Sequence, residues 1–538
     1  MKGHLMVDAG YSIRLFLGHS LLVISIFLIA HRAEAQQERP NIILFFTDDQ
    51  GWTDTSVQMM AGRDDSKSDF YQTPALERLA RDGMVFSNAY SPSPVCTPSR
   101  ASIQFGKTTA RLRQTTVHDV LAKNRGIDLK SETSLAQMIK TADLGYSTAH
   151  FGKWGFPPRS PEHAGYDFSD GGTNNGDGDY ADVHKRTLLP EDDPKRIFSL
   201  TKRANAFMEK QTKAGRPFFL QVSHYAVHVQ HYALKATIEK HKKLPRGKKG
   251  LDVDYRAPLP RRNAWMMNYS AMIEDLDTSL GLMLDKLDEL QIADNTYVIF
   301  TSDNGSGFRG NEPLKGGKAN LWEGGLRVPF VVRGPGVRKG SYCDKPVAGW
   351  DIYPTVRDLI GSKKPLPDGI DGGSLRSLLE KGNEGEVVRG FPGLVFHFPW
   401  YGNVPMTAIR VGDYKLMRHL NNGEHRLFNV SNDIEEQRDL SKTMPKKAKE
   451  LLNDLDTYLK EVGAENIEDM REARVNELIR YTARTNEEIK QTLALLNGAA
   501  SDERKKQLEV ALANHRRHLR IHQAGMERLE KAKMMMDW

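Results

Sequence analysis

Four oxygen-bearing side chains stand at the ends of two apolar segments of the sequence. Asp48 and Asp49 follow the run 41–46, and Asp303 and Asn304 follow the run 297–301. Adjacent carboxylates at the end of a buried strand repel each other unless a cation lies among them. Carboxylate and amide oxygens form a hard ligand set, which suits Ca²⁺ or Mg²⁺ and does not suit zinc. The sequence therefore predicts a divalent-cation site, and two solvated polar turns are the alternative.

A second reactive group is Cys96, which stands two residues before Pro98. Proline favours the first turn of a helix, and a helix N-terminus attracts anions and activates a thiol. The alternative is an inert buried thiol, as most unpaired cysteines are. The sequence contains one other cysteine, Cys343, so a disulfide scaffold is excluded. The wide spacing of the two favours separate roles over a bridge.

Alternating strand-like and helix-like segments would position these groups. Short apolar runs occur at residues 41–46, 84–87, 147–151, 218–222, 297–301 and 328–332, with amphipathic segments at 73–81, 134–140, 197–210 and 264–290 between them. This alternation predicts an α/β fold in which helices sandwich a largely parallel central sheet. Ligands of such folds bind beyond the carboxyl ends of the strands. We expect this catalytic domain to span residues 36–372.

The pattern changes after this domain. Residues 394–397, 408–411 and 414–418 resemble short strands, Gly412-Asp413 is typical of a hairpin turn, and a helix is expected at 446–461. These features predict a smaller α+β subdomain with an antiparallel sheet, spanning residues 373–463.

The last segment, residues 464–538, is charged and nearly free of glycine and proline. Apolar residues and histidines recur with heptad-like spacing at Leu508, Leu512, His515, Leu519, His522, Met526 and Leu529. Such a seam, with Asn497-Gly498 as a turn, predicts a helical hairpin tail. Packing on the body, self-association into an oligomer, and contact with a glycan or surface all stay open for it.

The N-terminus predicts export. Lys2 and Arg14 precede an apolar run at 15–30, and small residues follow at Ala33 and Ala35. This is the pattern of a signal peptide over residues 1–35, and the run is too short for a comfortable membrane span. We expect a periplasmic or extracellular protein without stable membrane insertion after cleavage, and a retained anchor is the alternative.

The composition narrows the class of protein. The chain has 538 residues, of which 39% are hydrophobic and 27% charged, and its formal net charge is +7. These values exclude wholesale disorder and a polytopic membrane protein. The positive excess is thin for the chain length, so we expect an anionic ligand and no nucleic acid.

The motif Cys96-x-Pro98-x-Arg100 resembles the core signature of type I sulfatases, in which the cysteine is oxidised to formylglycine. Other segments also resemble motifs of this family and occur in the family's order along the chain. They are residues 39–44, 48–51, 145–148, 152–154, 302–305, 315–318, 322–329 and 427–435. The chain is thus identified as resembling a formylglycine-dependent sulfatase of the alkaline phosphatase superfamily.

The resemblance implies a role for each site residue. Asp48, Asp49, Asp303 and Asn304 would bind Ca²⁺, with Mg²⁺ as the alternative, and Cys96 as hydrated formylglycine would be both a metal ligand and the nucleophile. Arg100 would hold the formylglycine hydroxyl, while Lys153 and Lys318 would bind sulfate oxygens. His228 would contact the ester or protonate the leaving alcohol. A formylglycine-generating enzyme or an anaerobic maturase is implied as a partner.

The sequence also departs from the family pattern. The family usually has histidine after Gly-Lys-Trp, and this chain has Gly155 there. His150 or His224 could substitute, or both could be structural. The glycine- and acid-rich segment 171–179 is expected to be a flexible loop near the mouth of the site.

We expect a sulfuric ester hydrolase that acts on a sulfated carbohydrate. Two alternatives stay open. One is a phosphonate or phosphate monoester hydrolase of the same superfamily. The other is a non-catalytic binder of sulfated glycans, made inert by the change at Gly155.

Overall fold

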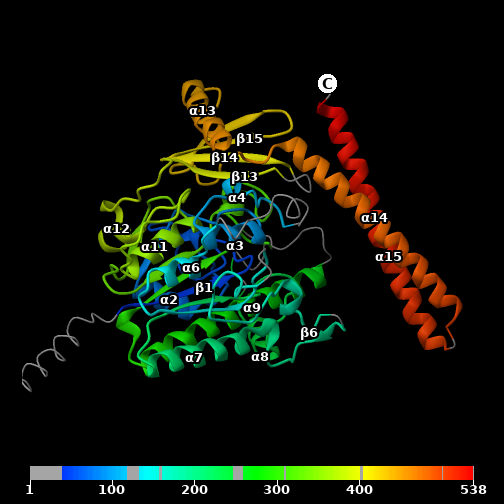
Figure 1. The fold of residues 1–538 in the computed structure, drawn as a ribbon, viewed down its shortest axis with the longest axis horizontal. Coiled ribbons are helices and arrows are strands. Elements are labelled where there is room, and N and C mark those ends of the chain that lie inside the picture. Colours follow the sequence, from blue (N-terminus) through cyan, green and yellow to red (C-terminus); the bar gives the residue numbers. More distant parts are fainter. Residues whose placement is uncertain are drawn as a thin grey trace, which may run out of the picture.

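A central sheet with helices on both faces forms the body of the molecule (Figure 1). The computed structural model describes residues 39–117, 132–156, 160–183, 185–245, 247, 259–307, 311–399, 404–499 and 501–536. The predicted signal peptide, residues 1–35, lies outside the described residues. Within the described part of the chain, no helix is both long and apolar enough to cross a membrane.

The described strands of the large sheet lie in the order β11-β2-β10-β9-β1-β8-β4-β5. Their bounds are β1 (Asn41–Thr47), β2 (Met84–Phe86), β4 (Ser147–Gly152), β5 (Phe168–Ser169), β8 (Phe218–Ser223), β9 (Thr296–Ser302), β10 (Phe330–Arg333) and β11 (Ser341–Cys343). β1 pairs in parallel with both β8 and β9, whereas β10 runs antiparallel to β9 and β2. The prediction of an α/β fold with a largely parallel sheet is confirmed, and β10 is its exception.

The central strand β1 explains why its sequence is apolar throughout. Ile43 and Phe45 pack into the core on one face of the sheet, while Ile42, Leu44 and Phe46 pack into the core on the other. A strand that is buried on both faces cannot show the alternation of a half-exposed strand.

Each core is closed by its own set of helices. Residues of α2 (Pro74–Arg81), α7 (Ile197–Lys213) and α9 (Leu259–Glu289) line the first core. Residues of α3 (Cys96–Phe105), α6 (Leu135–Thr141), α11 (Ile352–Leu359) and α12 (Arg376–Lys381) line the second. Shorter elements connect them: β3 (Ala89–Tyr90), α4 (Thr109–Leu112), η2 (Asn175–Gly178), β6 (Tyr180–Asp182), β7 (Thr187–Leu188), α8 (Lys235–His241), α10 (Glu323–Leu326) and β12 (Val347–Ala348).

A second, antiparallel sheet follows, as predicted. It consists of β13 (Leu394–Phe398), β14 (Met406–Val411), β15 (Tyr414–His419) and β16 (His425–Asn429), and α13 (Pro445–Glu461) packs on it. Val411 pairs with Tyr414, so Gly412 and Asp413 form the turn, and Gly412 has a φ of 58°. β16 was not predicted as a strand. The fully buried Lys415 joins the sheet to the body through Glu323, 2.8 Å away, and it also contacts Glu436 of its own subdomain, 2.9 Å away.

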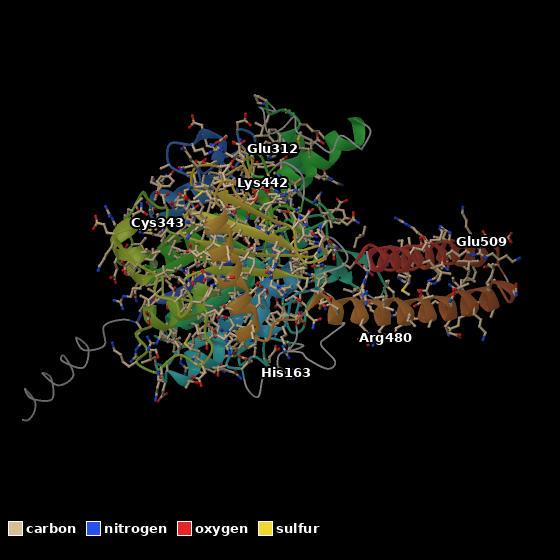
Figure 2. The ribbon with its side chains drawn as sticks, turned by 90° about the horizontal axis from the view of Figure 1, so that it is seen from above. His163, Glu312, Cys343, Lys442, Arg480 and Glu509 are labelled. Carbon is tan, nitrogen blue, oxygen red and sulfur yellow. The ribbon has the colours of Figure 1, made fainter. Side chains whose placement is uncertain are left out.

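The tail forms an antiparallel helical hairpin, α14 (Ile467–Asn497) and α15 (Asp502–Met536), which projects from the body (Figures 1 and 2). The seam residues Leu508 and Leu512 are buried between the helices, and so is Leu478 of α14. The helical tail is confirmed. The domain boundaries 36–372, 373–463 and 464–538 stay predictions.

Candidate active site

The register of two parallel strands brings the acidic residues together. Thr47, the last residue of β1, pairs with Ser302, the last residue of β9, so the residues that follow each strand are neighbours. The backbone N–H of Asp49 donates to Asp303 Oδ1 at 3.0 Å, and Asn304 Nδ2 donates to Asp49 Oδ1 at 2.8 Å. Asp48, Asp49, Asp303 and Asn304 are all buried.

This cluster fits a hard divalent cation. Oxygens of Asp48, Asp49 and Asp303 all lie within 4.8 Å of one another. Asp48 Oδ1 and Asn304 Oδ1 are buried without a hydrogen-bond partner in the described structure. Buried polar atoms without partners are costly, and a cation bound by carboxylate and amide oxygens would satisfy both atoms.

Three cationic side chains contact the same carboxylates. Lys153 Nζ lies 2.6 Å from Asp48 Oδ2, and Lys318 Nζ lies 2.6 Å from Asp49 Oδ1. The Arg100 guanidinium donates to Asp303 Oδ2 at 2.7 and 2.9 Å and to the carbonyl of Lys153 at 2.9 Å. Arg100 therefore ties the acidic cluster to the backbone of the lysine motif.

The two most buried carboxylates respond differently to this environment. Burial alone would raise the pKa of Asp48, but Lys153 and Arg100 outweigh burial and hold the pKa well below its usual range. Burial and the neighbouring Asp48 raise the pKa of Asp303 to about 7, although Arg100 opposes the shift. Burial and repulsion between Asp48 and Asp303 thus oppose the ionised form of Asp303, and a bound cation would relieve both costs.

Cys96 is the first residue of α3 and is 6% exposed. The next side chain, Thr97, donates from Oγ1 to the carbonyl of Gly155 at 2.7 Å, which fixes the start of the helix against the lysine motif. The helix N-terminus presents its free backbone N–H groups and positive dipole end at this point. The sulfur therefore lies where an anion is stabilised.

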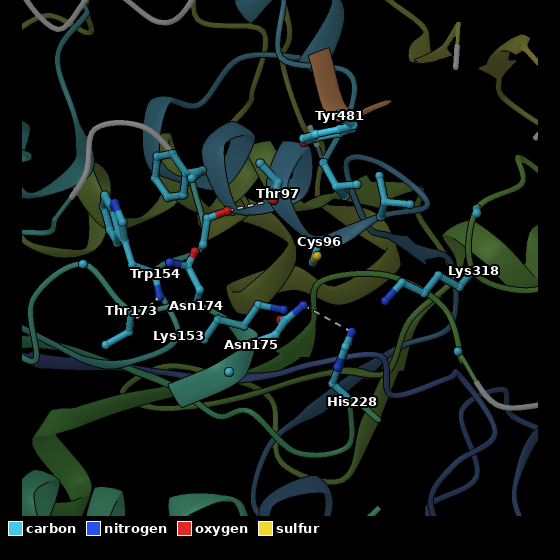
Figure 3. A pocket seen from close by; sticks show the side chains of 18 residues that line it. Cys96, Thr97, Lys153, Trp154, Thr173, Asn174, Asn175, His228, Lys318 and Tyr481 are labelled. Carbon is cyan, nitrogen blue, oxygen red and sulfur yellow. Dashed lines mark hydrogen bonds between the residues drawn. The ribbon is translucent and has the colours of Figure 1, made fainter. Parts of the chain in front are cut away.

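His228 stands on the opposite wall from Cys96 (Figure 3). Its Nδ1 lies 2.6 Å from the carbonyl of Val229, and its Nε2 lies 3.8 Å from Asp49 Oδ2 and 3.5 Å from Asn175 Nδ2. A carbonyl requires a donor, so Nδ1 carries a proton and Nε2 of the neutral ring is an acceptor. Burial lowers the pKa of His228, although Asp48 and Asp49 oppose the shift.

A cavity of about 1000 Å³ collects these groups. Cys96, Lys153, His228 and Lys318 all line it (Figure 3). Arg100 and the acidic residues lie behind this wall and are held by the contacts given above. The sequence-predicted site residues therefore converge on one place in the fold.

Comparison with known proteins decides the family. A family model described as Sulfatase matches residues 40–362, more than half of the chain, and a model described as N-sulphoglucosamine sulphohydrolase, C-terminal, matches residues 317–465. This chain belongs to the sulfatase family. The resemblance to type I sulfatases predicted from the motifs is confirmed.

Curated relatives agree with this assignment. A Sulfatase of Formosa agariphila is 29% identical over 509 residues, covering 78% of this sulfatase and 88% of the relative. An Ulvan-active sulfatase of the same organism is 29% identical over 478 residues, covering 82% and 86%. The prediction that this protein is an enzyme of the sulfatase class is confirmed.

Solved structures share the fold. Ps i-CgsB, solved in complex with k-i-k-neocarrahexaose, matches with a TM-score of 0.64 at 23% identity, covering 78% of this sulfatase and 93% of that chain. The phosphonate monoester hydrolase of Agrobacterium radiobacter matches with a TM-score of 0.58 at 18% identity, covering 78% and 96%. At these identities the likeness concerns the fold.

The histidines considered as substitutes at Gly155 do not line the cavity. His150 Nε2 lies 3.1 Å from Ser223 Oγ, and His224 Nε2 lies 3.3 Å from Ser279 Oγ. Burial lowers the pKa of each to about 3. Both are therefore neutral packing residues. Among the described lining residues of this sulfatase, His228 is the one histidine.

Gly155 itself adopts a φ of +76°, a left-handed backbone that favours glycine. A Cβ at this position would lie 3.4 Å from Lys153 Cε and 3.5 Å from Arg100 Cδ. A side chain here would thus start beside the site but on a strained backbone.

Sequence reasoning missed part of the cavity wall. Thr97, Asn174, Asn175 and Tyr481 also line the cavity. The sequence predicted that the loop 171–179 lies near the mouth of the site, but it did not distinguish the two asparagines. This loop contacts the body through Lys195 Nζ, which lies 2.6 Å from Asp179 Oδ1. Nothing in the helical pattern of the tail distinguished Tyr481.

Proposed function

We propose that this sulfatase is an exported enzyme that releases sulfate from a sulfated carbohydrate, using a formylglycine made from Cys96 and a bound divalent cation. The observation that carries the proposal is the convergence of Cys96, two lysines and a histidine on one cavity, in front of an acidic cluster with two unsatisfied oxygens.

The acidic cluster would hold the cation. Asp48, Asp49, Asp303 and Asn304, together with residue 96, provide the oxygen ligands that Ca²⁺ prefers, with Mg²⁺ as the alternative. When both groups are in place, the cation would neutralise sulfate oxygens and the hydrated formylglycine would provide the attacking hydroxyl. Arg100, held by Asp303 and the carbonyl of Lys153, keeps residue 96 oriented.

The cavity-facing side chains would bind and polarise the ester. Lys153 and Lys318 place two ammonium groups at the cavity wall, where they would bind sulfate oxygens as negative charge develops. His228 Nε2 is the ring nitrogen nearer the acidic cluster. In the neutral ring it would accept a hydrogen bond, and once protonated it would deliver that proton to the leaving alcohol. The Val229 carbonyl, which accepts from Nδ1, fixes the ring for this role.

A carbohydrate substrate is supported by the names of similar proteins. One relative is an Ulvan-active sulfatase, and one structural neighbour was solved in complex with k-i-k-neocarrahexaose. The cavity, at about 1000 Å³, is also far larger than a sulfate group requires. Export is supported by the signal-peptide pattern of residues 1–35, and it would give access to an extracellular polymer.

The test is mass spectrometry of the peptide that contains residue 96, together with sulfate release. After expression with a formylglycine-generating enzyme or an anaerobic maturase, we expect the aldehyde at residue 96 and release of sulfate from sulfated oligosaccharides. Cys96→Ala should abolish turnover, whereas Cys343→Ala is the matched control, because Cys343 is buried in β11 and does not line the cavity. An unmodified, active Cys96 would contradict the mechanism.

A second candidate activity is hydrolysis of phosphonate or phosphate monoesters, which the likeness to the phosphonate monoester hydrolase supports. A site made of a dication and two lysines can bind either anion. Comparing kcat/KM for aryl sulfate, aryl phosphate and aryl phosphonate esters separates the two. Glycan binding without any ester hydrolysis would instead indicate a non-catalytic binder.

A further inference from the structure

The helical hairpin contributes one residue to the active-site cavity. Tyr481 of α14 lines the cavity together with Cys96 and Thr97, and Figure 3 shows it on their side of the space. The two family matches end at residues 362 and 465, so Tyr481 lies beyond both. The hairpin of this sulfatase therefore adds to the active-site cavity a residue from outside the matched family regions.

The second helix holds this tyrosine in place. The ring of His522, on α15, stacks on Tyr481 with centroids 5.5 Å apart and planes inclined by 27°. Three residues away on each helix, Gly525 lets α15 approach closely, because a Cβ there would lie 3.3 Å from Leu478 Cδ1. The pairs Tyr481–His522 and Leu478–Gly525 therefore fit the same antiparallel register of the two helices.

A further contact extends the same register along the hairpin. His515 Nδ1 lies 3.3 Å from Glu488 Oε2, seven residues further along α14 and seven residues back along α15 from the stacked pair. The heptad-like histidines of the tail thus have definite partners, and the orientation of Tyr481 is set by the packing of the whole hairpin.

The base of the hairpin is fixed to the body. Thr115 Oγ1 donates to the carboxylate of Glu465, and His397 Nε2 lies 2.8 Å from the carbonyl of Glu465. Arg113 Nε donates to the carbonyl of Gly463 at 2.9 Å. α14 begins two residues after this anchor, so its first turns have a defined position relative to the cavity.

We propose that Tyr481 is a specificity-determining residue, whose ring packs against a sugar ring of an extended sulfated carbohydrate. This inference rests on the proposed function. The C–H groups of a pyranose ring form an apolar face, and a rigid aromatic side chain provides a matching surface at low entropic cost. Tyr481 is 38% exposed, so substrate can bury more of it.

The opposite wall suits the polar edges of the same sugar. Asn174, which precedes η2, and Asn175, the first residue of η2, line the cavity across from the tyrosine (Figure 3). Amide groups can both donate to and accept from hydroxyls. An aromatic wall on one side and amides on the other are the complement of a sugar ring.

The experiment measures binding separately from turnover. In a Cys96→Ala background, isothermal titration calorimetry is performed with size-fractionated oligosaccharides of ulvan and of chondroitin sulfate, and with inorganic sulfate. We expect Tyr481→Ala to weaken oligosaccharide binding about tenfold, as loss of an aromatic stacking contact predicts, and Tyr481→Phe to stay within about twofold. In the active enzyme, the loss should fall on KM for the oligosaccharide.

Ile479→Ala is the matched control, because Ile479 is 53% exposed on the same helix and does not line the cavity. Circular dichroism checks that each variant keeps its helices, and Tyr481→Leu removes the ring while keeping an apolar side chain. Equal affinities for Tyr481→Ala and its parent, an equal loss for Ile479→Ala, or oligosaccharides that bind no better than sulfate would overturn the inference. Absence of sulfate release by the matured enzyme, with the binding differences intact, would overturn the proposed function alone.

Discussion

The carboxyl ends of the central strands β1 and β9 and the helical hairpin show two different ways of placing a residue at the site. At the carboxyl ends of β1 and β9, the pairing of Thr47 with Ser302 puts Asp48 and Asp49 beside Asp303 and Asn304. In the hairpin, the register sets Tyr481 against His522, but contacts at the base, near Glu465, set the hairpin against the body. The first kind of placement follows from local sequence and sheet topology, and the second depends on docking.

The largest expected effect concerns the acidic cluster at the ends of β1 and β9. Removal of divalent cations with a chelator should abolish sulfate release, because the site would lose the positive charge that polarises the ester and activates the nucleophile. A ligand present at about 100 times its Kd stabilises the folded state by about 2.7 kcal/mol, so the melting temperature should also fall. Activity assays and thermal melts with and without added Ca²⁺ measure both effects.

Unchanged activity and melting temperature after exhaustive chelation would contradict the cation site. Mg²⁺ serves as the comparison ion in the add-back, because its smaller, octahedral coordination distinguishes it from Ca²⁺.

The next effect tests the wall opposite Cys96. His228→Ala should lower kcat for sulfated sugars by about 10²-fold, the lower end of the range for general acid catalysis. The loss should be smaller for 4-nitrophenyl sulfate, because nitrophenolate is a good leaving group that needs no proton. Steady-state kinetics with both esters measures the difference.

Equal losses on the two esters would assign His228 to sulfate binding rather than to proton transfer. His150→Gln is a matched control, since His150 is buried against Ser223 and does not line the cavity.

These two regions also show how far the sequence predicts the molecule. The apolar runs predicted β1, β2, β4, β8, β9 and β10 because these strands are largely buried, whereas the short and partly exposed β5 and β11 were not predicted. The ordered motifs predicted Cys96, Lys153, His228 and Lys318, which the structure places at one cavity. The antiparallel direction of β10 was not predicted, since a short buried strand has the same composition in either direction. Tyr481 could not be predicted, because a heptad seam determines how two helices pack on each other and not where the pair docks.

A smaller effect is expected at Gly155, where the sulfatase lacks the usual histidine. Gly155→Ala and Gly155→His should each lower the free energy of unfolding by about 1–2 kcal/mol, because both force a side chain onto a φ of +76°. We expect a higher kcat for Gly155→His than for Gly155→Ala, since an imidazole attached there would start beside Lys153 and Arg100. Urea unfolding and steady-state kinetics separate strain from chemistry.

Equal kcat values for the two variants would show that the imidazole adds nothing at this position. The site would then complete its reaction with the groups it already has.

The smallest effect on activity is expected in the hairpin seam. Leu512, 7% exposed on α15, packs between the two helices away from the cavity. Leu512→Ala should destabilise by about 2 kcal/mol, the lower end of the range for a buried leucine. The same change at Leu44 in β1, which is fully buried, should cost more, toward about 5 kcal/mol.

Hydrogen exchange shows where each loss occurs. For Leu512→Ala we expect faster exchange confined to α14 and α15, because the hairpin contacts the body chiefly at its base and can open without the sheet. For Leu44→Ala we expect faster exchange across β1, β8 and β9, which share one hydrogen-bonded ladder. If Leu512→Ala instead also raised exchange rates in the sheet, the hairpin would unfold cooperatively with the catalytic body. The distinction between residues placed by strand register and a residue placed by docking of the hairpin would then be wrong.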